Sequence, residues 1–442
     1  PWWFNPGYNG YPYVKTPVLD ELARNGIRFN MFYAASPVCT PTRASVVTGR
    51  HSDRMGAFNW NYSIRPEEIT IAHLLKEAGY STGHFGKWHL GPVKSGSPVN
   101  PGAMGFDYWL SHDNFFGYNP PLSENGDPWR EFRGESSEIL VESAIEWIKG
   151  NQNKNKPFLA VIWFGSPHDP FSASDLDYGL YFQTRWRTNN PVLPHYLGEI
   201  TAMDRAIGKL RQFLKIQKIK DNTLLWYCSD NGIPPEVVIE EEPLRGHKSQ
   251  VYENGIRVPA IIEWPAKFPK PLEIDIPCVT SDILPTVCDY LSIELPDRTL
   301  DGISLKPILE GTESQRMKPI CFWYNDFRNE EKYNLEWYLD KSFLLGNVPT
   351  HKTEGIQFHN FVDVSALRND FPGKAAVRDN RFKLVEAAPG KFELYDILKD
   401  PGEQINLISE YPVITQKLIE QLRAWQTEVE RSMTGVDYKF EK

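Results

Sequence analysis

Residues 158–164 read Phe-Leu-Ala-Val-Ile-Trp-Phe, an unbroken apolar run that leads into Gly-Ser-Pro-His-Asp-Pro at residues 165–170. Two further apolar runs, at residues 223–228 and 258–264, also end in polar or turn residues. Continuous rather than alternating hydrophobicity is typical of strands that are covered on both faces, as in parallel sheets. The runs therefore predict buried strands, and ligand sites are expected at their carboxyl ends.

Helical patterns with start and stop residues alternate with these strands, at residues 18–24, 71–78 and 197–216. A Thr precedes each of the first two patterns and a Gly follows it, as is typical of helix caps. The alternation predicts an α/β fold in which helices sandwich a large, mostly parallel sheet.

The sequence pattern of the chain changes after the polar segment at residues 310–318, so we place a domain boundary between residues 312 and 313. Residues 381–385 and 392–395 predict a hairpin with Gly390 in its turn, and residues 413–433 predict a closing amphipathic helix. We therefore expect a large domain at residues 1–312 and a small α+β subdomain, with a short antiparallel sheet, at residues 313–442. Residues 325–370 have no clear period and yield no prediction.

Composition and charge exclude several classes of protein. The chain has 442 residues, of which 41% are hydrophobic, enough to bury a large core. Its formal charge of -9 comes from acidic and basic residues mixed along the chain, so no basic stripe is available for nucleic acid. No apolar run approaches the ~20 residues of a membrane span. We therefore expect neither a nucleic-acid partner nor a membrane span.

The five cysteines form no C-x-x-C pair and cannot all be paired, which argues against a disulfide framework or a zinc site. Cys39 differs from the others because it opens the string C-T-P-T-R-A-S-V-V-T-G-R at residues 39–50. Pro41 suits a first helical turn and Gly49 a helix end. A helix N-terminus favours an anion, and Arg43 falls on the same helical face as Cys39. A buried, inert thiol in a capping loop is the alternative reading.

Residues 39–50 resemble the first signature of the sulfatase family, the formylglycine-dependent type I sulfatases of the alkaline-phosphatase superfamily. Residues 79–89, G-Y-S-T-G-H-F-G-K-W-H, are similar to the second signature. In that family a formylglycine-generating maturation enzyme reads the first signature in the unfolded chain and converts its Cys to formylglycine. The resemblance therefore implies a sulfuric ester hydrolase in which Cys39 is modified by such an enzyme.

Three more segments carry the resemblance. The Pro-His-x-Pro at residues 167–170 follows a strand, as it does in the family, and residues 244–259 are similar to the family's Gly-x-Lys and the turn after it. Ser-Asp-Asn-Gly at residues 229–232 follows another strand, although by itself it reads as an Asx turn. Residues 394–407 look like the small C-terminal subdomain of the family.

Roles carry over from the family onto these positions. The resemblance implies one divalent cation, usually Ca²⁺, with three ligands in this chain: Asp230, Asn231 and the modified Cys39. Oxygen ligands of this kind suit calcium. The hydrated aldehyde at Cys39, a gem-diol, supplies the nucleophile that attacks sulfur.

The remaining catalytic roles belong to cationic and imidazole groups. The resemblance implies that Arg43, Lys87 and Lys248 hold the sulfate oxygens. His168, with Lys248, protonates the departing oxygen, and His89 takes a proton from the second hydroxyl, which expels sulfate and restores the aldehyde. Lys87 and His89 are two residues apart on an extended chain, so both point to one side.

One departure from the family pattern lies at the start of the chain. Family members begin with a strand that ends in paired aspartates, which are two further metal ligands, and this chain starts at Pro1-Trp2-Trp3, just after that point. We therefore expect one core strand and half of the cation site to lie outside this numbering.

Two other functions stay open. One is a phosphonate or phosphate monoester hydrolase of the same superfamily, although the Lys87-x-His89 pair and the Pro-His-x-Pro segment resemble sulfatases. The other is an inactive protein that binds sulfated glycans, which the departure at the start of the chain suggests.

The expected substrate is a sulfated carbohydrate, with simple aryl sulfates as the alternative, because aromatic and amide residues crowd residues 112–119. Ordinary loop packing explains that segment equally well. Five residues are candidates for substrate contacts: His112, Asn114, Asp169, Arg185 and His195. Family resemblance leads us to expect a periplasmic or secreted protein.

Overall fold

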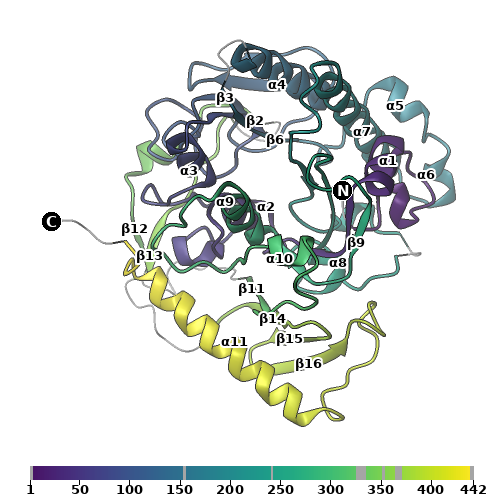
Figure 1. Ribbon diagram of the computed structural model, residues 1–442, viewed down its shortest axis with the longest axis vertical. Coiled ribbons are helices and arrows are strands. Elements are labelled where there is room, and N and C mark those ends of the chain that lie inside the picture. Colours follow the sequence, from purple (N-terminus) through teal and green to yellow (C-terminus); the bar gives the residue numbers. More distant parts are fainter. Residues whose placement is uncertain are drawn as a thin grey trace.

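The structure is a computed structural model, and it describes residues 3–152, 156–239, 242–324, 335–350, 354–363 and 371–438. Two five-stranded sheets form the larger part of the molecule (Figure 1). The first contains β10 (Cys278–Val279), β1 (Ile27–Tyr33), β8 (Arg257–Glu263) and β7 (Leu225–Cys228) in that order, with β9 (Leu272–Ile274) also paired to β1. The second has the order β5 (Arg130–Glu131), β4 (Pro121–Glu124), β3 (Tyr108–His112), β2 (Ser81–Lys87) and β6 (Phe158–Trp163).

Strand directions in these sheets are mixed. β2 runs parallel to β3 and β6, whereas β8 runs antiparallel to both β1 and β7. The α/β class is confirmed, although only some pairs are parallel, because an antiparallel strand that is covered on both faces has the same continuous apolar sequence as a parallel one. The three predicted strands are β6, β7 and β8.

The helices of the larger part lie around these sheets (Figure 1). They are α1 (Pro17–Asn25), α2 (Cys39–Thr48), α3 (Ile71–Glu77), α4 (Ser136–Gln152), α5 (Asp175–Gly179), α6 (Thr184–Arg187), α7 (Leu193–Ile216), α8 (Glu253–Ile256), α9 (Ile283–Leu291) and α10 (Lys306–Leu309). The helices predicted at residues 18–24, 71–78 and 197–216 correspond to α1, α3 and α7. Within the described residues, no helix is both long and apolar enough to span a membrane.

A cavity of about 990 Å³ separates the two large sheets, between β6 and β7. Among the described strands, β6 pairs only with β2 and β7 pairs only with β8, so one edge of each strand borders the cavity. Apolar side chains of α2, α3, α4 and α7 line the cavity. The cavity extends to the carboxyl ends of both strands, where polar residues line it. The expectation of a further strand outside this numbering stays a prediction.

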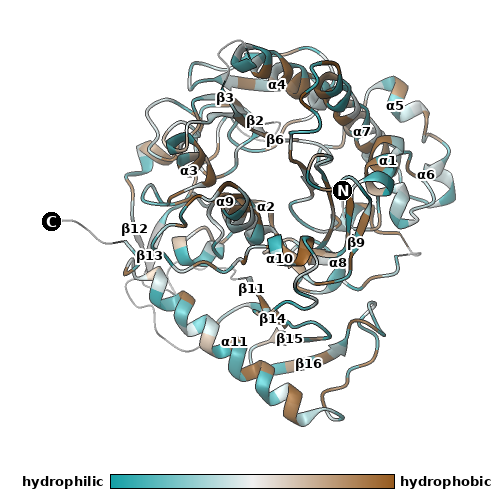
Figure 2. Cartoon of the chain, in the orientation of Figure 1, coloured by the Kyte–Doolittle hydropathy of each residue, from teal (hydrophilic) through white to brown (hydrophobic). Residues whose placement is uncertain are grey.

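The C-terminal part is built on a separate antiparallel sheet of four strands: β11 (Ile320–Tyr324), β14 (Lys374–Arg378), β15 (Phe382–Ala388) and β16 (Lys391–Asp396). The predicted hairpin is confirmed as β15 and β16, and Gly390 in its turn has a φ of 73°. The predicted closing helix is α11 (Pro412–Met433), which alternates polar and apolar residues along its length (Figure 2). Its apolar face packs on this sheet through Leu418, Leu422 and Val429.

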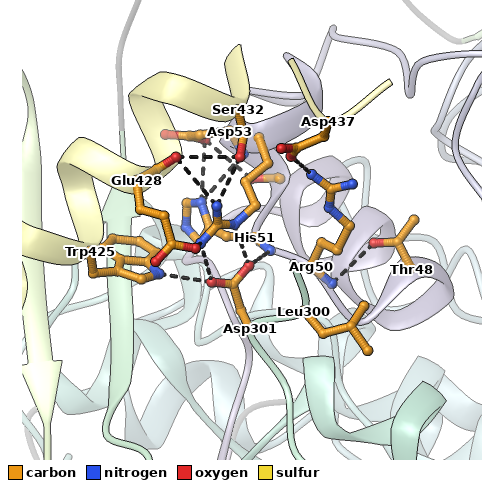
Figure 3. Close-up of polar contacts among 12 residues, drawn as sticks. Thr48, Arg50, His51, Asp53, Leu300, Asp301, Trp425, Glu428, Ser432 and Asp437 are labelled. Carbon is orange, nitrogen blue, oxygen red and sulfur yellow. Dashed lines mark hydrogen bonds and ion pairs between the residues drawn. The ribbon is translucent and has the colours of Figure 1, made fainter. Parts of the chain in front are cut away.

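A buried polar cluster joins α11 to the larger part of the molecule (Figure 3). The guanidinium of Arg54, in the short turn η2 (Ser52–Met55), donates to both carboxylate oxygens of Asp301, at 2.8 and 2.9 Å. The same group contacts Glu428 at 3.1 Å and Ser432 at 2.9 Å, both on α11. Because Arg54 is only 1% exposed, these contacts fix the helix to the larger part at one buried point.

The segment at residues 325–370, which has no clear period in its sequence, contains β12 (Leu335–Trp337) and β13 (Phe361–Asp363), an antiparallel pair. Residues 325–334, 351–353 and 364–370 of this segment lie outside the described residues.

Candidate active site

Cys39 is the first residue of α2, as predicted, and Gly49 ends the helix in the left-handed region with a φ of 71°. The thiol is almost fully buried, at 2% exposure, and its Sγ donates to Oδ1 of Asn231 at 3.2 Å. Asn231 lies just beyond the carboxyl end of β7, so the helix start and the strand end meet at this contact. The thiol thus lies where free backbone amides favour a negative charge.

Arg43, one turn along α2, connects the two large sheets. Its Nε and Nη2 donate to Oδ2 of Asp230 at 3.1 and 2.6 Å, beyond the end of β7. Its Nη1 donates to the carbonyl of Lys87 at 2.8 Å, at the end of β2. The guanidinium also lies 4.8 Å from the centre of the Trp163 ring, on β6. One side chain therefore contacts the carboxyl ends of three strands.

Lys87 and His89 approach Cys39 from the end of β2. His89 has a φ of 56°, and this left-handed turn follows directly after the strand. Burial lowers the pKa of Lys87 to about 8, although the nearby Cys39 favours its charged form. Burial and the charge of Lys87 hold the pKa of His89 well below its ordinary value, so this imidazole is neutral beside the thiol.

His168 and Lys248 form a pair at the same end of the cavity, where His168 Nε2 lies 3.3 Å from Lys248 Nζ. Nδ1 of His168 donates to the carbonyl of Asp169 at 2.8 Å, which leaves the lone pair of Nε2 directed at the ammonium. Burial, followed by the charges of Lys248 and Lys87, holds the pKa of His168 well below its ordinary value. The pair therefore consists of a neutral imidazole and a cationic lysine, and the proton that lies between the two nitrogens belongs to the lysine.

Asp230 is ionised despite its surroundings. Burial opposes the charge, but Arg43, Lys87 and Lys248 together hold the pKa of this carboxyl well below its ordinary value. The same lysines act on Cys39: burial disfavours the thiolate, yet Lys248 and Lys87 lower the pKa of Cys39 to about 5. Even with Cys39 as a thiolate, three cationic side chains against two anions leave this end of the cavity positive, so it attracts an anion.

Backbone contacts hold the two segments of the site together behind these side chains. The amide of Gly232 donates to the carbonyl of Gly255 at 2.9 Å, and the amide of Lys248 donates to the carbonyl of Ile233 at 2.8 Å. The segment that carries Asp230 and Asn231 is thus fixed against the segment that carries Lys248.

Seven predicted residues line the large cavity together: Cys39, Arg43, Lys87, His168, Asp230, Asn231 and Lys248. His89 lies next to this group through its contact with the Cys39 thiol. The residues that the signatures singled out, from segments up to 209 positions apart along the chain (residues 39 and 248), therefore meet in one place.

A calcium site would need more oxygen ligands than this group supplies. Asp230 and Asn231 offer carboxylate and amide oxygens, whereas Ca²⁺ takes about 6–8. Arg43 already occupies one of the Asp230 oxygens, and the described residues contain no cluster of three or more His, Cys, Asp or Glu side chains that could hold a metal ion. The two residues fit as part of such a site and do not complete it.

The five candidates for substrate contacts are dispersed. His112 is fully buried, and its Nε2 lies 3.1 Å from the carbonyl of Pro349, while its Nδ1 accepts from the amide of Asn114. His195 lies against Tyr178, with ring centres 4.4 Å apart. Arg185 lies on α6 beside Trp186, and Asp169 is the residue whose carbonyl orients His168. None of the five lines the large cavity, and their contact with a substrate stays a prediction.

Two aromatic residues of the site were not singled out from the sequence. Phe115 stacks on His168, with ring centres 4.3 Å apart and planes 15° apart, and its ring centre lies 6.0 Å from Lys87 Nζ. Trp163 stacks against Arg43. Trp163 could have been noticed as the last residue of a strand that leads into a signature, whereas nothing in the sequence distinguishes Phe115 from Phe116.

Known proteins resemble this chain in sequence. The model of the Sulfatase family matches residues 2–293, and that of the C-terminal region of N-sulphoglucosamine sulphohydrolase matches residues 246–341. The chain is 26% identical to an ulvan-active sulfatase of Formosa agariphila, over 99% of this chain and 81% of the relative. It is 28% identical to arylsulfatase A of Homo sapiens, over 95% of this chain and 84% of the relative.

The fold is also similar to that of solved structures. The crystal structure of Ps i-CgsB in complex with k-i-k-neocarrahexaose aligns with a TM-score of 0.78 at 23% identity, over 98% of this chain and 92% of the other. This likeness extends across both the large sheets and the C-terminal sheet.

Proposed function

Because the chain belongs to the sulfatase family and is a sulfuric ester hydrolase, we propose that its substrate is a sulfated carbohydrate and that its nucleophile is formylglycine made from Cys39. The observation that carries this proposal is the convergence of Arg43, Lys87 and Lys248 on the buried start of α2. A sulfate monoester carries one negative charge, and its transition state spreads charge over several oxygens, so cations placed in advance stabilise it.

Each cation has a separate part in holding the sulfate group. Arg43 is fixed by Asp230 and by the Lys87 carbonyl, so its position does not change when an anion binds. Lys87 and Lys248 are compact charges that enter the cavity from two different segments of the chain. Side chains that are held in place before the substrate arrives need little reorganisation during the reaction.

The leaving oxygen receives its proton from the pair formed by His168 and Lys248. His168 is neutral and its Nε2 faces the ammonium of Lys248, so the proton available to the departing alcohol begins on Lys248. Water supplies the remaining atoms: the sulfate ester and one water give the alcohol and free sulfate.

Formylglycine at residue 39 would supply, when hydrated, one hydroxyl for attack and a second whose proton His89 can remove. His89 suits this role because it is neutral and lies beside residue 39. We propose Asp230 and Asn231 as this chain's ligands to Ca²⁺, together with residue 39. A periplasmic or secreted location is part of the same proposal and would be checked by cell fractionation.

The first test is mass spectrometry of the tryptic peptide from Phe29 to Arg43, from protein produced with its maturation enzyme. We expect a peptide of lower mass, in which an aldehyde replaces the thiol, and sulfate release from sulfated mono- or oligosaccharides. The Cys39→Ala variant, folded and measured alongside, should release no sulfate. An unmodified thiol in fully active protein would overturn the proposed nucleophile.

A panel of substrates separates the remaining alternatives. Faster release of phosphate than of sulfate from matched aryl esters would favour the phosphonate or phosphate monoester hydrolase. Turnover limited to aryl sulfates would count against a carbohydrate substrate. Binding of sulfated glycans without turnover, by protein that carries the aldehyde, would identify a binding protein.

A further inference from the structure

Two glutamates and a lysine are buried together at the junction between α8 and the C-terminal sheet. Nζ of Lys383, on β15, lies 3.0 Å from Oε1 of Glu253 and 2.9 Å from Oε1 of Glu403. The side chains of all three residues are completely buried. Burial of ionised groups is costly unless every charge is paired, so each member of this cluster depends on the others.

Further contacts hold Glu253 from the remaining sides. The hydroxyl of Tyr33, on β1, donates to Oε2 of Glu253 at 3.0 Å, and Arg257 lies 3.6 Å from the same oxygen. The backbone amide of Glu253 donates to Oε2 of Glu403 at 2.7 Å. Glu253 is the first residue of α8, so the cluster fixes both the backbone and the side chain at the start of this short helix.

α8 leads directly to the active site. Its residues Asn254 and Gly255 accept hydrogen bonds from Ile233 and Gly232, which follow Asp230 and Asn231. The segment before α8 carries Lys248, whose amide donates to Ile233. A shift of Glu253 would therefore move both the Asp230 segment and the Lys248 segment.

We propose that Lys383 is a positioning residue for sulfate ester hydrolysis: through Glu253 it sets the place of Lys248 and of Asp230 from the C-terminal sheet. This inference rests on the proposed roles of Lys248 and Asp230. Without the lysine, two buried carboxylates would lose their shared cation and repel one another. Glu253 would then leave its position, and α8 would follow.

The test compares Lys383→Met with Arg423→Met. Arg423 pairs with Glu386, which lies on the same strand as Lys383 and is 1% exposed, so this variant also leaves a buried carboxylate without its cation. Besides Arg423 on α11, Glu386 accepts a hydrogen bond from the amide of Gly390 in the hairpin turn, and neither of these partners lies on α8. The two variants should lose comparable thermal stability, and only one of them should affect the active site.

Each protein is measured well below its melting temperature and normalised to its content of residue 39 aldehyde. For Lys383→Met we expect kcat/KM for a sulfate ester to fall about 10- to 100-fold, since a displacement of about 1 Å in a catalytic group can cost this much. Arg423→Met should stay within about twofold of the wild type. Hydrogen exchange should accelerate at residues 229–256 in Lys383→Met alone.

Equal losses of kcat/KM in the two variants, or unchanged exchange at residues 229–256, would overturn the proposal. If Lys383→Met does not fold, the comparison is made with Tyr33→Phe, which removes only the hydroxyl that donates to Glu253. That variant should show a smaller fall in kcat/KM with the same local exchange, and wild-type behaviour in both would overturn the proposal. Because exchange does not depend on the reaction, failure of the proposed function would appear separately, as absence of sulfate release from the wild type.

Discussion

Phe115 covers one face of the His168 ring, so this apolar side chain limits how the imidazole can turn. A further restraint on the ring is the hydrogen bond from Nδ1 to the carbonyl of Asp169. For Phe115→Ala we expect kcat/KM to fall about 10- to 100-fold, because His168 would lose its alignment with Lys248. Steady-state kinetics on a sulfate ester check this prediction.

Tyr118 offers the matched control, since it belongs to the same loop and is 45% exposed. Tyr118→Ala should change kcat/KM by no more than about twofold. Equal effects in the two variants would mean that the loop as a whole matters and the stacking does not.

Glu199 on α7 is a buried carboxyl that accepts from the backbone amide of Ser172, behind the Pro-His-x-Pro segment. Burial raises the pKa of Glu199 to about 8 from its ordinary value of 4.5. Between these two pH values the folded protein keeps a proton that the unfolded chain releases, so the free energy of unfolding falls as pH rises, by at most about 1.4 kcal/mol per pH unit. The stabilisation is complete below pH 4.5 and is lost as pH passes 8.

We expect Glu199→Gln to remove this dependence, because the amide does not titrate. The melting temperature of the variant minus that of the wild type should increase from pH 5 to pH 8.5, as followed by calorimetry. For Glu142→Gln, on the exposed face of α4, the melting temperature should depend on pH as that of the wild type does. If the melting temperature of Glu199→Gln depended on pH as strongly as that of the wild type, the assignment of this dependence to the Glu199 carboxyl would be wrong.

At the scale of elements, Gly232 sets how closely the end of β7 approaches α8. A Cβ at this position would lie 1.9 Å from the carbonyl oxygen of Asn254 and 2.6 Å from Cα of Gly255. Gly232→Ala must therefore separate the two segments of the active site. We expect a loss of about 2–4 kcal/mol in stability and a large fall in kcat/KM, measured by thermal unfolding and kinetics.

Gly150, near the end of α4, has no atom of the described residues within 4 Å of the place where a Cβ would lie. Gly150→Ala should stabilise the protein by about 0.5–1 kcal/mol, because alanine favours a helix over glycine. Glycine to alanine should thus lower stability at Gly232 and raise it at Gly150. Destabilisation at both positions would show that the close approach at Gly232 is not the cause of the loss there.

The elements themselves were largely predictable from the sequence. Caps and apolar runs placed α1, α3, β6 and the hairpin of β15 and β16 to within a few residues, because these signals are local. The direction of a strand is not local: the apolar run of β8 is compatible with either direction, and only its partners decide. The stacking of Phe115 on His168 is not local either, because the two residues are 53 positions apart, and the sequence therefore does not predict it.

At the scale of the whole molecule, the signatures predicted a set of candidate site residues, and the structure brings those residues together at one cavity. They did not predict the contacts between the two parts of the chain. Lys383 and Glu253 are 130 residues apart, and Arg54 and Glu428 are 374 apart. Each pair becomes visible only once both parts are folded and packed.

The contacts of Arg54 with Asp301, Glu428 and Ser432 allow a prediction at this scale. Arg54→Met would leave Asp301 without the guanidinium that, against the effect of burial, holds the pKa of its carboxyl well below the ordinary value. We expect a loss of about 3–5 kcal/mol, because one charge of a buried pair would remain alone. Thermal unfolding and faster proteolysis between α10 and α11 check this.

Arg130 pairs with Glu124 at 3.1 Å on the surface, and the two side chains are 66% and 40% exposed. Arg130→Met should cost less than about 1 kcal/mol. A similar loss in both variants would show that burial of the Arg54 cluster adds nothing to its strength.

The burial of Cys39 has a consequence for the time order of synthesis. The thiol is closed in by Asn231, which is 192 residues further along the chain. At a translation rate of about 5–20 residues per second, the ribosome needs about 10–40 s to make that distance. Throughout this interval Cys39 lacks its contact with Asn231, so the order of the segments itself would leave the first signature open to any enzyme that reads unfolded chains.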